Sequence, residues 1–172
     1  MSAQLDLLET DVAVARWLKI TPLMSRLEIR ARIGELEKFL FSLPNPLLPK
    51  DLPTKHTFAP GVYLRTVFMK KGEVWIGRIH KHEHASIVSQ GVASVVTEFG
   101  AVTHRAFESF TSPPGTKRAL VILEDTIWTC VHANPDNIHD VEVLKNIYTT
   151  EDYAEIGFEV PQLGALLWLG VS

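Results

Sequence analysis

Hydrophobic positions along the chain follow two periods, one before and one after a cluster of prolines. Residues 1–43 carry apolar positions at roughly helical spacing, first in an amphipathic segment from Leu5 to Trp17 and then in a second stripe. The second stripe comprises Leu23, Leu27, Ile33, Leu36, Leu40 and Phe41. Thr21-Pro22 is typical of a helix start, because threonine can cap the helix and proline suits its first position. The pattern predicts a helical arm over residues 1–43.

The other side of this arm is charged, which leaves two interpretations of the stripe open. The charged positions are Arg26, Arg30, Arg32, Glu35, Glu37 and Lys38. The stripe either packs on the main domain or serves as a dimerisation or docking surface for another chain.

Four prolines within residues 44–53 end the helix and predict a stiff, extended linker. From about His56 the hydrophobic period changes to two, which is typical of strands. The expected strands are Val62–Met69, Val74–His84, Ser86–Ser89, Ala93–Glu98, Val102–Phe107, Lys117–Leu123 and Ile127–His132. Turn signals separate them, among them Ser89-Gln90-Gly91 and Glu124-Asp125. This spacing predicts a mainly β domain, a sandwich or barrel, over residues 54–133.

Residues 134–172 predict a C-terminal extension with helical content and an apolar tail. Val141–Ile147 is expected to form a short helix, and Thr149–Asp152 to cap another that runs through Ile156. The tail carries Leu163, Leu166, Leu167, Trp168 and Leu169, which would be adhesive if exposed. We therefore expect a homo-oligomer formed through the helical arm or through this tail, or burial of the tail on its own domain.

Composition narrows the class of protein. The net charge of −3 in 172 residues and the pI near 6.2 give no electrostatic case for a nucleic acid or an anionic membrane as partner. No apolar run reaches the ~18 residues of a membrane span, and the acidic start of the chain does not resemble a secretory signal. Cys130 is the only cysteine, so no disulfide can form within the chain. A cytoplasmic location is expected.

Candidate chemistry is concentrated between Gly72 and Gly91. Arg78, His80, His82 and His84 occupy alternate positions there, so on one continuous strand their side chains would share a face. Such a face could supply the ligand shell of a small barrel.

The spacing of this stretch resembles the first motif of the cupin superfamily. Gly72, five residues, Arg78-Ile79-His80, three residues, His84, six residues and Gly91 keep that spacing, with Arg78 in place of a histidine and His84 in place of a glutamate. Pro113-Pro114-Gly115 matches the turn of the second motif, where Arg118 replaces a histidine. The resemblance covers about half of the chain and implies a cupin-like jelly-roll barrel.

Several segments also resemble uncharacterised cupin-like proteins of bacteriophages and prophages. These are Phe58–Tyr63, Ile79–His84, Ser112–Ala119, Leu123–Trp128 and the histidine at position 132. This resemblance implies phage structural proteins as partners and the virion as an alternative location.

A typical cupin metal site uses three histidines and a glutamate, of which this chain keeps one matching histidine and one substitute. His80, His84 and His132 are the candidate ligands for one divalent ion of iron, manganese, nickel or zinc. The alternative is that His80 and His84 form hydrogen bonds in a polar interior. Cys130 has apolar neighbours and is expected to be a buried packing residue rather than a nucleophile.

The two arginines favour a different ligand. A guanidinium cannot ligate a metal, but it binds carboxylate or phosphate through paired hydrogen bonds. If Arg78 and Arg118 both point inward, they form an anion site, with Tyr63 as a polar wall. Trp75, Phe110 and Trp128 are candidates for an apolar wall or for plain core packing. Arg118 could instead lie at a solvated rim beside an exposed Lys117.

Three functions are compatible with these residues. The first is a phage-type cupin-like protein with a degenerate metal site, which binds a small anionic molecule or acts in a protein assembly. The second is a metal-dependent cupin enzyme, of oxygenase or isomerase type, that uses His80 and His84. The third is a structural or virion-associated scaffold.

Overall fold

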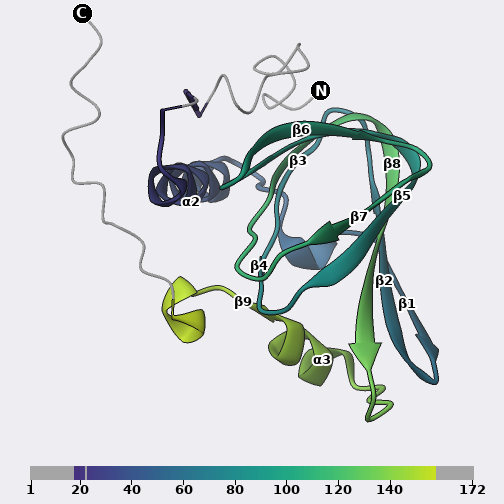
Figure 1. The fold of residues 1–172 in the computed structure, drawn as a ribbon. Coiled ribbons are helices and arrows are strands. Elements are labelled where there is room, and N and C mark those ends of the chain that lie inside the picture. Colours follow the sequence, from purple (N-terminus) through teal and green to yellow (C-terminus); the bar gives the residue numbers. More distant parts are fainter. Residues whose placement is uncertain (1–17, 22, 158–172) are drawn as a thin grey trace, which may run out of the picture.

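The computed structural model describes residues 18–21 and 23–157. The expected amphipathic segment from Leu5 to Trp17 and the apolar tail from Leu163 to Leu169 lie outside the described residues. The described chain forms a helix, a strongly curled antiparallel sheet and a short helical extension (Figure 1). No described helix is long and apolar enough to cross a membrane.

Helix α2 (Arg26–Ser42) begins four residues later than the Thr21-Pro22 signal predicts. Ser25 caps it instead. The Ser25 side chain accepts a hydrogen bond from the Glu28 backbone N–H at 3.3 Å, and the Glu28 carboxylate accepts one from the Ser25 N–H at 2.7 Å. This reciprocal capping box satisfies two N–H groups at once, which explains why the helix starts here.

The buried side of α2 lies against the sheet, as the first of the two interpretations of the arm requires. Its core members are Ile29, Ile33, Leu36 and Leu40, which share one hydrophobic cluster with residues of β3, β5 and β8. The predicted stripe was partly wrong, because Leu23, Leu27 and Phe41 are exposed. Arg30, expected on the charged side, is buried and pairs with the Glu98 carboxylate at 3.0 Å.

The prediction of a mainly β domain of jelly-roll type is confirmed. The strands are β1 (Thr54–Ala59), β2 (Gly61–Met69), β3 (Val74–Ile76), β4 (Ile79–His80), β5 (His84–Thr97), β6 (Gly100–Arg105), β7 (Glu108–Ser112) and β8 (Ala119–Asn134). The main sheet has the order β1-β2-β8-β5-β6, with β3 paired to β8 and β7 paired to β5. Within the described residues the sheet curls but does not close, since β1 and β6 remain edges (Figure 1).

The expected single strand Val74–His84 is wrong. The structure breaks it into β3 and β4 because the backbone here bonds to the segment before β8. The Gly77 N–H donates to the Arg118 carbonyl at 2.8 Å, and the His80 N–H donates to the Thr116 carbonyl at 3.1 Å. A further gap follows His80, so the period-two argument fails and His82 is exposed.

Two expected turns are bends inside long strands. Ser89-Gln90-Gly91 lies within β5, where the pairing with β8 shifts register, and Glu124-Asp125 lies within β8. Gly91 has a φ of +84°, and a Cβ atom there would lie 2.3 Å from the Asp125 carbonyl oxygen. Only glycine fits this close crossing.

The extension after β8 contains α3 (Val141–Tyr148), β9 (Thr149–Thr150) and the 3-10 helix η2 (Tyr153–Ile156). Both helical segments agree with the sequence prediction, although Thr149 and Thr150 pair with β4 as a strand. A further 3-10 turn, η1 (Pro49–Asp51), lies in the proline-rich segment. Helix α3 and η1 both contribute residues to a cavity inside the curled sheet.

Candidate functional site

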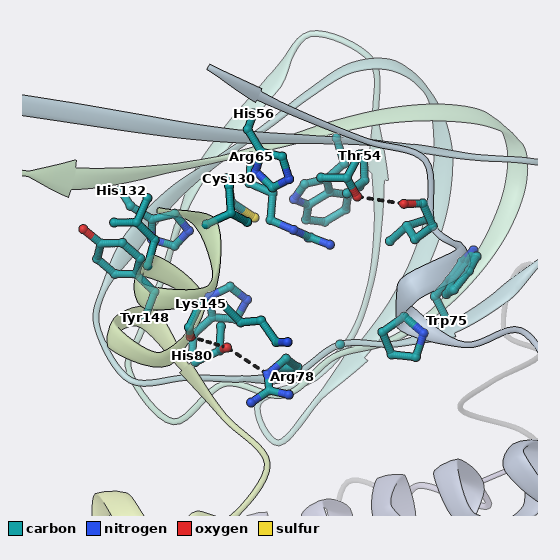
Figure 2. A pocket seen from close by; sticks show the side chains of 18 of the residues that line it. Thr54, His56, Arg65, Trp75, Arg78, His80, Cys130, His132, Lys145 and Tyr148 are labelled. Carbon is teal, nitrogen blue, oxygen red and sulfur yellow. Dashed lines mark hydrogen bonds between the residues drawn. The ribbon is translucent and has the colours of Figure 1, made fainter. Parts of the chain in front are cut away.

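A cavity of about 590 Å³ lies inside the curled sheet (Figure 2). Alternate residues of β2 line it, namely Tyr63, Arg65, Val67 and Met69. Register pairs each of the first three with a lining residue of β8: Tyr63 with His132, Arg65 with Cys130, and Val67 with Trp128. The cavity wall is therefore built in rows that run across both strands.

The three predicted histidines come together although they lie on separate strands, β4, β5 and β8. The rings of His80 and His84 stack with centroids 4.0 Å apart, and the His132 ring lies 5.0 Å from that of His84. Tyr148 of α3 extends the stack, 4.5 Å from His132. His82 does not belong to this group.

Arg118 lies beside this stack and is only 6% exposed. Its guanidinium lies 3.4 Å from each of three atoms: Nε2 of His80, Nε2 of His84 and Oγ of Ser86. It also donates to the Ser112 hydroxyl and lies 5.5 Å from the centroid of the Trp128 ring. The rim position considered from the sequence is therefore wrong for Arg118.

The neighbour of Arg118 is also buried. Lys117 was considered as an exposed partner of a rim arginine, but its Nζ lies 2.6 Å from a carboxylate oxygen of Glu37 on α2. Lys117 thus ties the helix to the sheet and leaves Arg118 to face the cavity.

Arg78 lines the cavity, but its charge is compensated. Its Nε donates to Oγ1 of Thr149 at 2.9 Å, and its Nη1 pairs with the Glu151 carboxylate. Arg78 and Arg118, which the sequence grouped into one anion site, therefore differ in how their charges are compensated. Arg78 belongs to a polar contact with β9 and the residue after it, whereas Arg118 has hydroxyl and imidazole neighbours.

Sequence reasoning missed Arg65. Figure 2 shows its guanidinium pointing into the cavity between the His132 end and the Trp75 end. In the described part of the chain, neither Arg65 nor Arg118 forms an ion pair. The period-two pattern of Val62–Met69 could have found it, since it places Arg65 on the same face as Tyr63.

The other predicted side chains are placed as follows. Tyr63 bonds through its hydroxyl to Nδ1 of His56 at 2.7 Å, and burial raises the pKa of this phenol. Trp75 and Trp128 line the cavity. Phe110 instead packs against a second hydrophobic cluster and stacks on His104 with ring centroids 3.9 Å apart. The second hydrophobic cluster comprises Val67, Met69, Trp75, Val88, Ala93, Val95, Leu120, Ile122, Trp128 and Cys130.

Burial keeps the imidazoles uncharged. Desolvation, followed by the Arg118 charge, lowers the pKa of His84 to about 4. Desolvation, followed by the charges of His84, Arg65 and Arg118, lowers the pKa of His132 to about 3. The pKa of His80 is also well below its usual value, mainly through burial and then through Arg118. All three rings are therefore neutral near pH 7.

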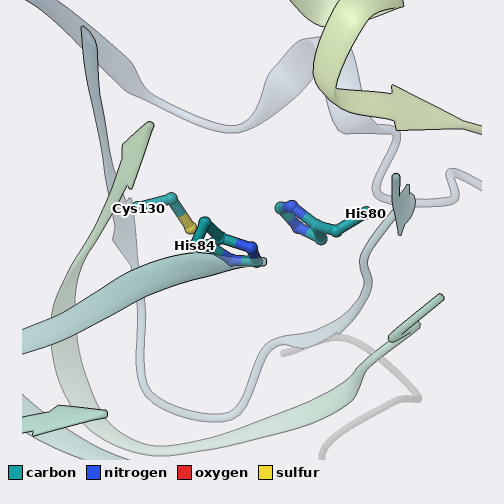
Figure 3. A group of neighbouring side chains, drawn as sticks. All are labelled: His80, His84 and Cys130. Carbon is teal, nitrogen blue, oxygen red and sulfur yellow. The ribbon is translucent and has the colours of Figure 1, made fainter. Parts of the chain in front are cut away.

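His80, His84 and Cys130 could hold a metal ion (Figure 3). Their ligand atoms all lie within 4.8 Å of one another, and two imidazoles with a thiolate suit a transition metal such as zinc. Nδ1 of His80 is buried without a hydrogen-bond partner. Cys130 is buried, as expected, and adds a ligand that the sequence did not suggest.

The charge of Arg118 opposes such an ion. Its guanidinium contacts Nε2 of both imidazoles, so a metal bound through those atoms would need the arginine to move. The donor set fits a metal by type, while the fixed positive charge beside it weakens the fit.

Comparisons with known proteins give only distant likenesses. No family model matches the chain, and no curated protein matches it. Among solved structures, a cupin-2 domain containing protein from Shewanella frigidimarina is 14% identical over 57% of this chain and 92% of its own, with a TM-score of 0.41. KdgF from Halomonas sp. is 19% identical over 52% of this chain and 86% of its own, with a TM-score of 0.43. EutQ from Clostridium difficile is 17% identical over 49% and 69%, with a TM-score of 0.42.

Proposed function

We propose that the cavity binds a small anionic molecule, with Arg118 as its deepest contact and Arg65 as its second. The observation that carries this proposal is that Arg118 is 6% exposed without a described ion pair. Taking a charge out of water costs several kcal/mol unless an opposite charge compensates it. A bound anion would supply that compensation.

The neighbours of Arg118 support an anion more than a cation. The hydrogen-bond partners of its guanidinium are the hydroxyls of Ser86 and Ser112 and two imidazoles, none of which carries a compensating negative charge. Arg65 contributes a second guanidinium, which points into the same cavity (Figure 2). Two guanidinium groups can together hold an anion by several charge-assisted hydrogen bonds.

Thermal unfolding with acetate and phosphate as probes tests this proposal. Either anion should raise the melting temperature saturably above that in chloride at equal ionic strength. Arg65→Gln and Arg118→Gln should abolish the rise, while Arg105→Gln, an exposed arginine on β6, should keep it. Arg65→Gln protects the test against misfolding of the buried Arg118 variant. An undiminished rise in folded Arg65→Gln and Arg118→Gln would overturn the proposal.

A metal-dependent enzyme is the second candidate, favoured by the cluster of His80, His84 and Cys130. Elemental analysis of the purified protein separates it from the first. Stoichiometric iron, manganese, nickel or zinc that is lost in His84→Ala would support it. Metal-free protein that takes up none of these ions would exclude it.

A role in an assembly is the third candidate, and the phage link implied by the sequence resemblance stays a prediction. Leu23 and Phe107 are both 95% exposed, which is unusual for large apolar side chains and favours a contact with another chain. A homo-oligomer that dissociates in Phe107→Ser or Leu23→Ser, measured by sedimentation velocity, would support it. A monomer at all concentrations would count against a homo-oligomer.

A further inference from the structure

The two ends of the cavity differ in chemistry. One end is formed by Tyr63, His132 and Tyr148, whose rings stack on one another. The opposite end is formed by Leu52, Met69, Trp75 and Leu120, which belong to the second hydrophobic cluster or pack against it. Figure 2 shows His132 and Tyr148 on one side, Trp75 on the other and Arg65 between them. A molecule held by Arg65 and Arg118 therefore has an apolar compartment next to its charged group.

The register of the sheet gives this compartment its length. Along β2 the lining residues change from Arg65 to Val67 and then Met69, while Trp128 of β8 faces Val67. At about 3.3 Å per residue, the four steps along the strand from Arg65 to Met69 span roughly 13 Å. That distance accommodates a phenyl ring with a short carbon linker to an acid group.

Two polar side chains at the apolar end, those of Trp75 and Thr54, are already bonded within the protein. The Trp75 indole N–H donates to the Glu73 carboxylate at 2.9 Å, and the Thr54 hydroxyl donates to the Leu52 carbonyl at 2.8 Å. Hydroxyl groups of a ligand in this compartment would lose their hydrogen bonds to water and would contact methyl, thioether and ring surfaces instead. Unpaired hydroxyls lose free energy there, whereas an apolar body gains it by leaving water.

We infer that the ligand is an amphipathic organic acid, with a carboxylate at Arg118 and Arg65 and an aryl or branched alkyl body that extends towards Trp75 and Met69. The inference rests on the proposed anion site and adds the chemical class of the ligand. It excludes polyhydroxylated acids as the preferred class, because their hydroxyls would face Met69, Trp75 and Leu120.

Three carboxylates that share a head group test the body of the ligand: acetate, gluconate and 3-phenylpropanoate. Isothermal titration calorimetry should show 3-phenylpropanoate binding at least about tenfold more tightly than acetate or gluconate. Only 3-phenylpropanoate has a large apolar body that is buried from water in the compartment. Arg65→Gln should weaken all three, since it removes the contact to the shared carboxylate.

A matched pair of leucine variants keeps the test specific. Leu52→Asn should remove the preference for 3-phenylpropanoate and leave acetate affinity unchanged, because Leu52 lines only the apolar end. Leu64→Asn, at a similarly half-buried position of β2 whose side chain does not line the cavity, should keep the preference.

The outcomes separate this inference from the proposed function. Acetate and 3-phenylpropanoate binding equally, with both dependent on Arg65, would overturn the amphipathic ligand and leave the anion site standing. Gluconate binding more tightly than 3-phenylpropanoate would overturn it as well. If no carboxylate or phosphate binds, both proposals fall.

Discussion

Arg118 and His84 meet in the protein interior beside the cavity, where Nη2 of the guanidinium lies 3.4 Å from Nε2 of the imidazole. A guanidinium only donates hydrogen bonds, so this contact requires Nε2 to accept. The proton of the neutral ring then resides on Nδ1, which faces the His82 carbonyl at 3.3 Å. The arrangement places a permanent positive charge against one of the atoms that a metal ion would use.

Removing this charge should therefore improve metal binding. Arg118→Met keeps the length and much of the volume of the side chain while eliminating the repulsion. We expect its affinity for Zn²⁺ to rise at least about tenfold over wild type, a free-energy gain of about 1.4 kcal/mol. Competition with a zinc-sensitive dye measures the affinity.

Two variants control this experiment. Adding His84→Ala to Arg118→Met should abolish the gain, because it deletes an imidazole ligand. Arg105→Met removes an exposed arginine outside the cavity lining and should leave Zn²⁺ affinity at the wild-type level. Equal affinity in wild type and Arg118→Met would show that Arg118 does not oppose a metal.

The buried imidazoles predict that acid destabilises the fold. The pKa of His84 is about 4 and that of His132 about 3, both below the ordinary value of 6.5 that an unfolded histidine has. Between these values and 6.5 the unfolded chain binds more protons than the native one, so stability falls as pH falls. Urea unfolding should give full stability above about pH 6.5 and a progressive loss towards pH 4.

Replacing one histidine tests the source of this loss. His132→Phe should reduce the slope of the unfolding free energy against pH between pH 6.5 and 4, because a phenyl ring takes up no proton in the unfolded chain, while His80 and His84 keep their contributions. His139→Gln changes an exposed histidine and should leave the profile as in wild type. An unaltered slope in His132→Phe would mean that the acid sensitivity originates elsewhere.

The ion pair between Arg30 and Glu98 is expected to be essential for docking of α2. The Arg30 side chain is 6% exposed and that of Glu98 is fully buried, with the Tyr153 ring 4.8 Å from the guanidinium carbon. Arg30→Met leaves the carboxylate buried without its partner, which should cost about 3–5 kcal/mol of unfolding free energy. Chemical denaturation measures this loss.

Glu98→Gln combined with Arg30→Met should recover part of that loss, since no buried charge remains in the pair. The solvated pair of Lys145 and Glu142 provides a surface comparison, with side chains 43% and 74% exposed. Glu142→Gln should change stability by less than about 1 kcal/mol. If Arg30→Met loses as little unfolding free energy as Glu142→Gln, the buried pair contributes little to stability.

Local sequence patterns predicted the type of structure better than its long-range pairings. Alternation identified the strand that carries Tyr63, and it could have included Arg65 because both lie on one face of β2. Burial of Arg30 could not be foreseen in this way, since its partner Glu98 is 68 positions away in the chain. A helix pattern alone assigns an arginine to the solvent side.

The site was predictable only in part, because local spacing marks some of its residues and long-range strand pairing brings in the others. His80 and His84 follow a recognisable spacing, and a histidine at the end of a strand drew attention to His132. Cys130 was assigned to packing because its sequence neighbours are apolar, and only the pairing of β8 with β2 and β5 brings it to the cavity. The Ser89–Gly91 segment carries the composition of a turn, and a bulge uses the same residue types.

Gly91 and Gly61 offer a direct test of why β5 can bend where it crosses β8. Both have positive φ angles, +84° and +75°, so alanine is strained at either position. A Cβ at Gly91 would also lie 2.3 Å from the Asp125 carbonyl oxygen, whereas nothing lies within 4 Å of one at Gly61. Gly61→Ala should therefore cost about 1 kcal/mol of unfolding free energy.

Gly91→Ala should cost several times more, about 3 kcal/mol or above, because backbone atoms of β8 must move to admit the methyl group. Urea denaturation measures the unfolding free energy of both variants. The strain from a positive φ is common to both, so it cancels in the difference between their losses. The excess in Gly91→Ala then measures the close crossing itself. Equal losses would mean that the crossing yields easily and that β5 and β8 bend here for another reason.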